Sequence, residues 1–299
     1  MRTLLHDLRF AIRILAKAPG FTAAAVISLA LGIGVNTTIF SLINGVIFRP
    51  LPRVKEPAAL VWFRAPASYP DYEDFRDQND VFSGISALSG TNEFSLSQGG
   101  QPELVKGEFV SANYFSVLGV EISTGRAFLP EEDRLADARP VVVLSYGLWQ
   151  RRFGGDPNLI GGSVSLNGLT FTVIGVAPQG FVSAEAALPR DLWAPMAIYP
   201  RLSSTRAGEG DVVTDRLRNR GTYSLNLIAR LKPGVTRAQA QAAMTAIVAR
   251  LPKERYHQTF DERLKAVELL IVSGGLDPRD RAGARRAMKV DPMVALRCE

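Results

Sequence analysis

The stretch PVVVLSYGLWQRRF, Pro140–Phe153, joins a β-branched run directly to a helical one. The first part, Pro140–Ser145, favours a strand because branched side chains pack well on a pleated surface. The second part, Tyr146–Phe153, predicts a helix that ends at the breaker Gly154–Pro157. A strand that passes at once into a helix indicates a domain of mixed α and β structure.

The segments that follow add a hairpin, a strand and a helix. Val164–Asn167 and Leu169–Val176 flank an Asn-Gly dipeptide, which is typical of tight hairpin turns. Tyr223–Leu231 predicts a further strand. Thr236 is then expected to cap a helix that runs to Leu251.

The preceding segments have the same character. Ser68 can cap a helix, and Pro70 suits its first turn. Leu104–Val110 predicts a strand, and Ser111–Val117 a short helix that opens on a capping serine. Residues 201–220 are polar and without a period, which predicts a long loop. Together these elements predict an α+β domain of two small lobes.

A long uncharged stretch lies upstream of this domain. There is no charged residue between Lys17 and Arg49, and Phe21–Phe48 is mostly apolar. As a helix, about 28 residues reach roughly 42 Å, enough to cross a hydrocarbon core of about 30 Å. We predict a single membrane-spanning helix over residues 20–48. The alternatives are a buried helix of a soluble protein and a cleaved signal peptide, whose apolar region is shorter.

The flank of this stretch indicates its orientation. Residues 1–17 contain the basic residues Arg2, Arg9, Arg13 and Lys17, which favours a cytoplasmic N-terminus and an exterior position for the bulk of the chain. Apolar residues recur there at helical spacing. We predict that residues 1–19 form a basic amphipathic helix on the cytoplasmic membrane surface, with an irregular charged flank as the alternative.

Small residues recur along one side of the predicted span. They form a ridge that lets a second helix approach closely. The ridge consists of Gly20, Ala24, Ser28, Gly32 and Asn36. We predict a helix-packing face here; the alternative is the ordinary composition of a membrane helix.

Side chains suited to chemistry are scarce. The chain has one cysteine, Cys298, and two histidines, His6 and His257. This excludes an intramolecular disulfide framework and disfavours a zinc site or a histidine-based catalytic site. The sequence contains no phosphate-binding loop, dinucleotide fingerprint or serine-nucleophile elbow. We therefore predict no enzyme activity, no catalytic residue, no cofactor and no metal.

Three further groups of residues are interpreted as structural. The acidic set within Asp71–Asp80 lacks the alternating ligands and central glycine of a calcium loop, and is expected to be a solvated helix face. Glu131–Asp133 predicts the first turn of a helix rather than an acid/base pair. Trp62, Trp149 and Trp193 lie in apolar contexts and are expected to pack in the core.

The distribution of charge disfavours nucleic-acid binding. The formal net charge is +6, of which +3 belongs to residues 1–17 and +2 to residues 277–299. The remainder of the chain is thus nearly neutral. A nucleic-acid-binding domain needs a basic stripe on its folded part, and none is predicted here.

Segments spread along the chain together resemble one family of membrane proteins. They are similar to the MacB-type permeases of the FtsX-like ABC transporter superfamily, in particular to the large duplicated permeases of Acidobacteria. The segments are DLRFAIRILAKAPGFTAAAVISLALGIGVNTTIFSLINGVIFRPLP (Asp7–Pro52), SYPDYEDFR (Ser68–Arg76), VSANYFSVLGVEISTGRAFLPEED (Val110–Asp133), PVVVLSYGLWQRRFGGDPNLIG (Pro140–Gly161), SLNGLTFTVIGVAPQGF (Ser165–Phe181) and ARLKPGVTRAQAQA (Ala229–Ala242).

This resemblance implies a topology and a role. Residues 1–19 correspond to a cytoplasmic elbow helix, 20–48 to the first membrane helix, and 49–252 to a periplasmic core domain with a porter-like lobe and a second lobe. The implied protein is a single-pass inner-membrane subunit of an ATP-driven efflux or export system. Its implied partners are the lipid bilayer, a separate ABC ATPase, a permease partner or second copy of the chain, and a periplasmic adaptor. No catalytic residues are implied.

The chain also departs from the family. The family's core domain is followed by three further membrane helices, whereas the longest apolar run after Leu251, Leu269–Leu276, is too short to span a membrane. Ala284–Arg297 nevertheless resembles the family's cytoplasmic C-terminal tail. We therefore expect residues 253–299 to be a linker and a basic tail, and the chain to be internally shortened.

Three functional hypotheses follow from the match and the departure. The first is a partial transporter subunit without an ATPase of its own. The second is a non-functional, internally deleted remnant. The third is a membrane-anchored periplasmic module that binds a ligand or a partner protein.

Overall fold

A computed structural model describes residues 19–20, 22–23, 27–34, 37, 51–64, 66–98, 101–135, 138–185, 189–203, 217–220, 224–251 and 269–271. The chain divides into two compact units, Met1–Phe48 and Arg49–Glu299. The described residues of the first unit are helical. No helix formed by the described residues is long and apolar enough to cross a membrane. The helices predicted over 1–19 and 20–48 lie largely outside the described residues and stay predictions.

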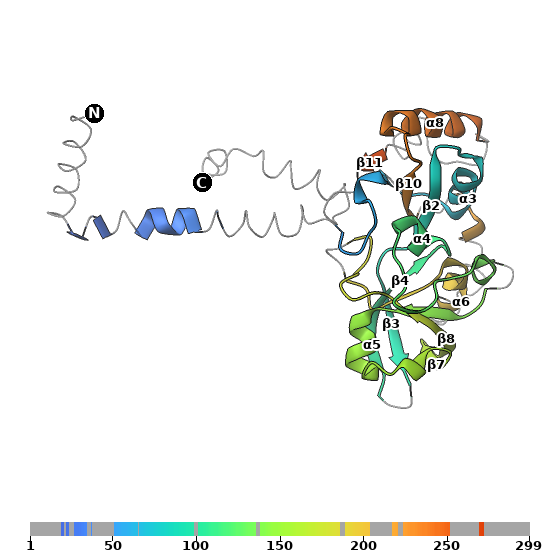
Figure 1. The fold of residues 1–299 in the computed structure, drawn as a ribbon, viewed down its shortest axis with the longest axis horizontal. Helices are drawn as coiled ribbons and strands as arrows, with labels where there is room; N and C mark the ends of the chain where they lie inside the picture. The colour runs from blue at the N-terminus through green and yellow to red at the C-terminus, as the bar shows by residue number, and fades with distance from the viewer. Residues whose placement is uncertain are drawn as a thin grey trace. The chain divides into compact units, whose positions relative to one another are not determined.

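The second unit alternates short strands with helices (Figure 1). Its strands are β1 (Leu60–Phe63), β2 (Phe82–Leu88), β3 (Asn92–Ser97), β4 (Glu103–Val110), β5 (Thr124–Gly125), β6 (Val141–Leu144), β7 (Ser163–Leu166), β8 (Leu169–Val176), β9 (Leu192–Pro195), β10 (Asn226–Leu231) and β11 (Leu269–Ile271). Its helices include α3 (Tyr69–Gln78), α4 (Tyr114–Leu118), α5 (Tyr146–Phe153), α6 (Tyr199–Ser203) and α8 (Arg237–Arg250). Short 3₁₀ helices are η1 (Pro57–Ala59), η2 (Pro130–Asp133), η3 (Pro157–Leu159) and η4 (Met196–Ile198).

The strands of the second unit form one sheet with two parts. In one part, β11, β1, β10 and β2 lie side by side and antiparallel. In the other, the order β4-β3-β7-β8-β6-β9 closes into a ring, because β9 also pairs in parallel with β4. The two parts join where Leu88 of β2 pairs with Val110 of β4. The expected mixed α/β domain is therefore confirmed, with a closed ring of strands as its larger part.

Alternation along the strands distributes apolar side chains between two cores. On β1, Val61 and Phe63 belong to the first core, whereas Leu60 and Trp62 belong to the second. The period is two residues because successive side chains of a strand point to opposite faces. The first core also receives side chains from α3, α5 and α8, and the second receives α4. Each core draws on strands from both parts of the sheet, so the two parts fold as one body.

Several elements lie where the sequence predicts them. Helix α5 spans Tyr146–Phe153 and ends at Gly154, whose φ of 61° is left-handed. Strands β7 and β8 form the predicted hairpin, with both turn residues, Asn167 and Gly168, at positive φ. Helix α8 is capped by Thr236 as predicted, through a reciprocal pair of hydrogen bonds with Gln239.

The serine cap predicted for α4 is wrong. Helix α4 begins at Tyr114, and its N-cap is Asn113 rather than Ser111. The Ser111 hydroxyl instead accepts a hydrogen bond from the backbone N–H of Ala87 at 3.0 Å and lies 2.7 Å from the Asn113 side chain. Ser111 is held by strand β2, so its side chain is not free to cap a helix.

The acidic helix face and the segment after residue 251 also differ from expectation. Asp71 is 5% exposed and completes a capping box with Ser68, so it is not part of a solvated face. Asp71 and Asp74 both form ion pairs with Arg220.

Strand β11 lies within the segment that we interpreted as a linker and tail, and it extends the sheet beside β1.

Candidate functional site

The described part of the folded unit begins with a short segment, Leu51–Glu56, that we call the strap. Leu51 and Val54 are buried in the second core. Arg53 and Glu56 adopt left-handed φ angles of 67° and 45°. That region is unfavourable for residues with a Cβ atom, and persists only where surrounding contacts enforce it. The strap is therefore held in a conformation that it would not adopt alone.

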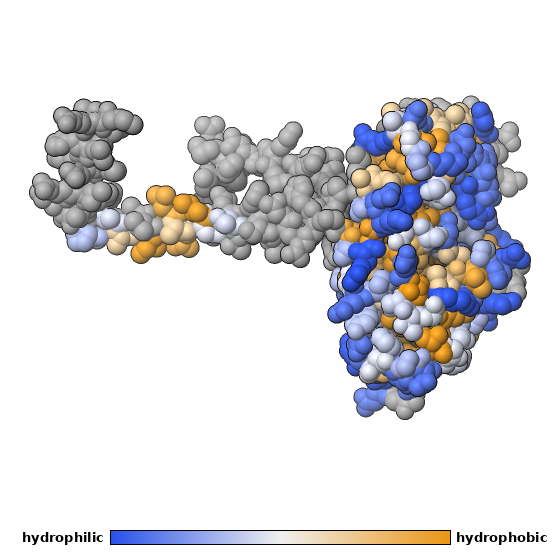
Figure 2. Space-filling model, viewed as in Figure 1, coloured by the Kyte–Doolittle hydropathy of each residue, from blue (hydrophilic) through white to orange (hydrophobic). Residues whose placement is uncertain are grey.

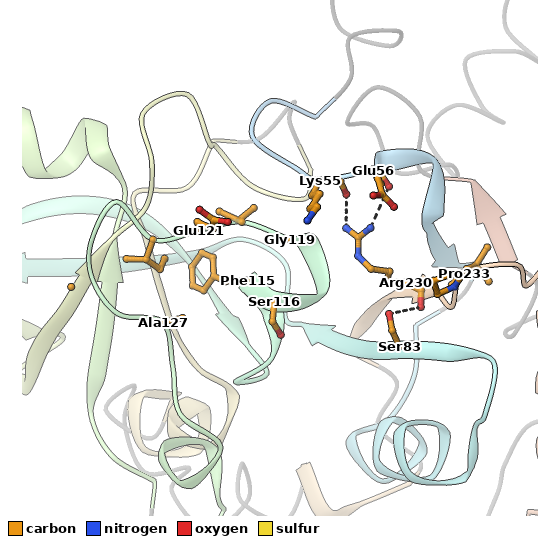
Figure 3. Close-up of a pocket in the computed structure, with 14 residues that line it drawn as sticks. Lys55, Glu56, Ser83, Phe115, Ser116, Gly119, Glu121, Ala127, Arg230 and Pro233 are labelled. Atoms are coloured by element: carbon orange, nitrogen blue, oxygen red, sulfur yellow. Dashed lines mark hydrogen bonds between the residues drawn. The ribbon is translucent and has the colours of Figure 1, made fainter.

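Arg230 of β10 donates hydrogen bonds that keep the strap in this conformation. Its Nη2 atom donates to the carbonyl oxygen of Lys55 at 2.6 Å, and its Nη1 atom to that of Glu56 at 3.4 Å. Its Nε atom donates to the carbonyl oxygen of Val117 in α4 at 2.7 Å. Figure 3 shows the guanidinium between the strap and α4. Burial lowers the pKa of Arg230, and the nearby Glu56 charge opposes this.

Gly119, the C-cap of α4, allows the strap to lie close. Its φ is 65°, and a Cβ atom there would lie 2.5 Å from the Cβ atom of Lys55. The backbone N–H of Lys55 donates to the carbonyl oxygen of Leu118 at 3.1 Å. Any larger residue at 119 would push the strap away from α4.

A groove of about 770 Å³ opens beside these contacts (Figure 3). Its floor includes Phe115 and Val120, which are almost fully buried. Its rim carries the side chains of Lys55, Glu56 and Glu121. An apolar floor with charges of both signs around it suits binding of an amphiphilic group or of a partner surface.

A second polar feature lies inside the domain, around Glu108 of β4. Its Oε1 atom is 3.6 Å from Nη2 of Arg190, which also contacts Oε2 of Glu185 at 2.9 Å. The Ser183 hydroxyl lies 3.3 Å from Oε2 of Glu108. Burial raises the pKa of Glu108 to about 8, although the Arg190 charge opposes the shift. Burial therefore makes this carboxyl group easier to protonate than an exposed glutamate, which reduces the cost of enclosing it in the second core.

The structure places the residues singled out from the sequence as follows. Gly20, Ser28 and Gly32 are helical and exposed, and a Cβ atom on either glycine would meet nothing within 4 Å. Ala24 and Asn36 lie outside the described residues, as do His6, His257 and Cys298. The helix-packing face stays a prediction. Among the described residues, no group of three or more His, Cys, Asp or Glu is arranged to hold a metal ion.

The tryptophans and the acidic turn are where we predicted them. Trp62 and Trp193 are buried in the second core. Trp149 is half-buried against the first core, and its Nε1–H donates to the carbonyl oxygen of Asp156 at 3.0 Å. The acidic turn Glu131–Asp133 lies in η2, a short helical turn that Pro130 begins.

The sequence analysis missed Arg230, Gly119, Glu108 and Arg190. Arg230 contacts carbonyl groups 113 and 175 residues away along the chain, and no local pattern signals such a pairing. Glu108 lies at an inward position of the predicted strand Leu104–Val110, where an apolar residue is expected. In the sequence Glu108 shares a face with the polar Lys106, so the strand pattern alone gave no signal that Glu108 is buried.

Comparison with solved structures shows which known fold the chain shares. The fold is similar to the periplasmic region of MacB from Actinobacillus actinomycetemcomitans, with 12% identity, a TM-score of 0.51, and coverage of 83% of this chain and 96% of that one. A domain of a permease protein from Porphyromonas gingivalis matches at 17% identity and a TM-score of 0.47, covering 74% of this chain and 89% of that one. The extracellular domain of the noncanonic ABC-type transporter YknZ from Gram-positive bacteria matches at 13% identity and a TM-score of 0.44, covering 64% and 90%.

The family follows from the sequence itself. Residues 22–247 match the MacB-like periplasmic core domain. The chain therefore belongs to the MacB-like periplasmic core domain family, as the resemblance implied. No curated protein matches the chain significantly.

Proposed function

We propose that this chain is a permease-family subunit of an ABC-type export system. Residues 20–48 are its membrane anchor, and the folded unit that follows is its extracytoplasmic domain. The family match over residues 22–247 carries this proposal. The subunit has no ATPase of its own, and it works with a separate ABC ATPase and with a permease partner or a second copy of itself.

The exposed helix in the first unit supports the membrane anchor. Residues 27–34 are helical, and Ile27, Leu29, Leu31 and Ile33 are each about 60% exposed. Figure 2 shows this stretch as predominantly hydrophobic. Large apolar side chains exposed together on one helix need lipid or a protein partner to cover them.

The topology of the sheet supports an extracytoplasmic domain inserted into a membrane protein. Strand β1 follows the strap, and β11 pairs with it antiparallel, so Ile271 lies opposite Val61. The chain thus reaches the end of β11 at the sheet edge where β1 begins. Ends that lie close together are typical of a compact domain and allow it to be inserted into a longer chain.

Purification of complexes from native membranes tests the proposed role. The tagged full-length chain is extracted in mild detergent after crosslinking, and its partners are identified by mass spectrometry. We expect an ABC ATPase, together with a permease subunit or a second copy of the chain. A tagged unrelated single-pass protein controls for nonspecific recovery. Repeated recovery of the chain with no ATPase would contradict the proposal.

The groove favours a second candidate function, a membrane-anchored binding module. Its volume of about 770 Å³ and its apolar floor are of the kind that holds small amphiphiles. Thermal unfolding of the detergent-purified chain, measured across a panel of amphiphiles, tests this candidate. A ligand that binds the folded state raises the unfolding temperature. An unchanged temperature across the panel would count against it.

A further inference from the structure

We propose that the strap, Leu51–Glu56, is a detachable element with two positions, docked and released, and that Arg230 is the latch that keeps it docked. This proposal concerns the folded unit alone and does not depend on a transport role. It rests on the hydrogen bonds of the strap, the strain in its backbone and its small share of the core.

The docked strap bridges the two parts of the sheet. Nε of Arg53 donates to the carbonyl oxygen of Gln179, in the loop after β8 of the ring, at 3.0 Å. Arg230 of β10, in the other part, donates to the carbonyl oxygens of Lys55 and Glu56. A displacement of the strap therefore acts on both parts at once.

Backbone strain favours release. Two of the strap's residues, Arg53 and Glu56, occupy the left-handed region without being glycine. The Glu56 side chain makes no capping hydrogen bond to η1, and the local support is limited to the backbone bond from Ala59 N–H to the Glu56 carbonyl oxygen at 3.0 Å. When the strap leaves its docked position, both residues can relax to ordinary φ values.

Release leaves most of the domain intact. The strap contributes only Leu51 and Val54 to the second core, which is otherwise built from strands, α4 and nearby loops. Its hydrogen bonds to Gln179 and to Arg230 lie at the exposed surface. Segments with few buried contacts and exposed hydrogen bonds open at lower free energy than the global unfolding transition.

Release also changes the groove. Lys55 and Glu56 line the groove together with Phe115 and Val120. When the strap moves away, the groove widens and the carbonyl oxygen of Leu118 loses the backbone N–H of Lys55 as its partner. The latch thus links the chain just after the predicted membrane span to access to the groove.

Hydrogen–deuterium exchange on the full-length chain in detergent tests the latch. Arg230→Met keeps a flexible apolar stem like that of arginine and removes the three donor atoms Nε, Nη1 and Nη2. We expect exchange of the peptide over residues 51–59 to rise about tenfold, while the peptide over α8 exchanges at its original rate. Arg237→Met, an exposed arginine in the first turn of α8, is the matched control and is expected to change neither peptide.

Two further variants test whether backbone strain favours release and whether the latch needs the guanidinium group. Glu56→Asn places a residue that tolerates the left-handed region, so exchange over 51–59 should slow by about two- to threefold. Arg230→Lys keeps the charge with a single ammonium group and should give an intermediate rate.

Three results would overturn the latch. These are unchanged exchange of residues 51–59 in Arg230→Met, an equal rise in every segment of the sheet, or a wild-type rate in Arg230→Lys. None of them bears on recovery of an ATPase, so failure of the latch and failure of the proposed function are distinguishable.

Discussion

Glu108 is a carboxyl group enclosed by the second core, beside Arg190 and facing Trp193 across the β4–β9 pair. Side-chain accessibility is 0% for both members of the ion pair. A buried ion pair of this kind is weak support for stability because each charge loses its hydration. Its more direct consequence is a dependence of stability on pH.

The pKa of Glu108 sets the sign of that dependence. Burial raises it from 4.5 to about 8 in the folded protein. The folded state therefore binds more protons than the unfolded state between these values, and the free energy of unfolding falls as pH rises through this window. Asp133 acts in the same direction over a lower window, because burial raises its pKa to about 6.

We predict that Glu108→Gln flattens this dependence between pH 5 and pH 9. Denaturant unfolding of the full chain at several pH values measures it, and the free energy of unfolding should fall across the window by about 4 kcal/mol more in the wild type than in the variant. Glu121→Gln, on the exposed rim of the groove, should keep the wild-type profile. A wild-type profile in Glu108→Gln would show that Glu108 does not titrate as described.

Gly107 allows β4 and β9 to pack closely, and so helps to close the ring. A Cβ atom at Gly107 would lie 2.4 Å from Cδ1 of Leu192 and 2.6 Å from Cε2 of Phe94. We predict that Gly107→Ala lowers the free energy of unfolding by about 1–3 kcal/mol. Gly147→Ala is the matched control, because its Cβ atom would meet only Oγ of Ser145 at 3.9 Å, and a helical alanine is favourable. Equal stabilities for the two variants, from denaturant unfolding, would refute this account.

Helix starts could be predicted where the capping residue and its partner are close in sequence. Ser68 caps α3 and Thr236 caps α8, and each partner lies three residues further on. Ser111 looked equivalent, but its hydroxyl bonds to Ala87 of β2, 24 residues away. Ser111 differs from the two capping residues because its hydroxyl is hydrogen-bonded to a strand that is distant in sequence. Such a tertiary contact leaves no local pattern in the sequence.

At the scale of the element, the cap of α3 gives a prediction. Ser68→Ala removes the acceptor for the backbone N–H of Asp71 and leaves the buried Asp71 carboxylate with one partner fewer. We expect a loss of about 1–2 kcal/mol in the free energy of unfolding. Ser116→Ala, on the exposed side of α4, should cost less. A cost for Ser68→Ala no greater than that for Ser116→Ala would show that the capping box contributes nothing.

The first unit gives a prediction about the membrane. Leu31→Lys places a charge in the helix of residues 27–34, which we propose lies in lipid, at a cost of about 3 kcal/mol near the bilayer centre. The variant should be lost from carbonate-washed membranes more readily than the wild type. Leu104→Lys changes an equally exposed leucine of β4 and should stay with the membranes. Equal retention of both variants would contradict a membrane-embedded helix.

For the molecule as a whole, the sequence was most informative where structure is local. The hairpin turn, helix α5 and the mixed α/β class follow from short patterns. The closing of the ring could not be predicted, because parallel pairing of β4 with β9 joins residues 85 apart, such as Gly107 and Leu192. The strap and its latch could not be predicted from the sequence for the same reason. They depend on contacts between strap and β10 that span most of the domain.

The predicted organisation places one folded unit outside the membrane and the N-terminus inside. Family membership and the exposed apolar helix both support this arrangement. Glu121 offers an exposed position in the folded unit, and Asp7 a position before the predicted span. The native Cys298 can be replaced by serine, which leaves a chain without cysteine for single-site labelling.

Labelling with a membrane-impermeant maleimide tests the arrangement most directly. The variants Glu121→Cys and Asp7→Cys are each made in the Cys298→Ser chain and treated in intact spheroplasts and after lysis. We predict that Glu121→Cys is labelled in intact spheroplasts and that Asp7→Cys is labelled only after lysis. Protection of Glu121→Cys until lysis would place the folded unit inside the cell and contradict its assignment as an extracytoplasmic permease domain.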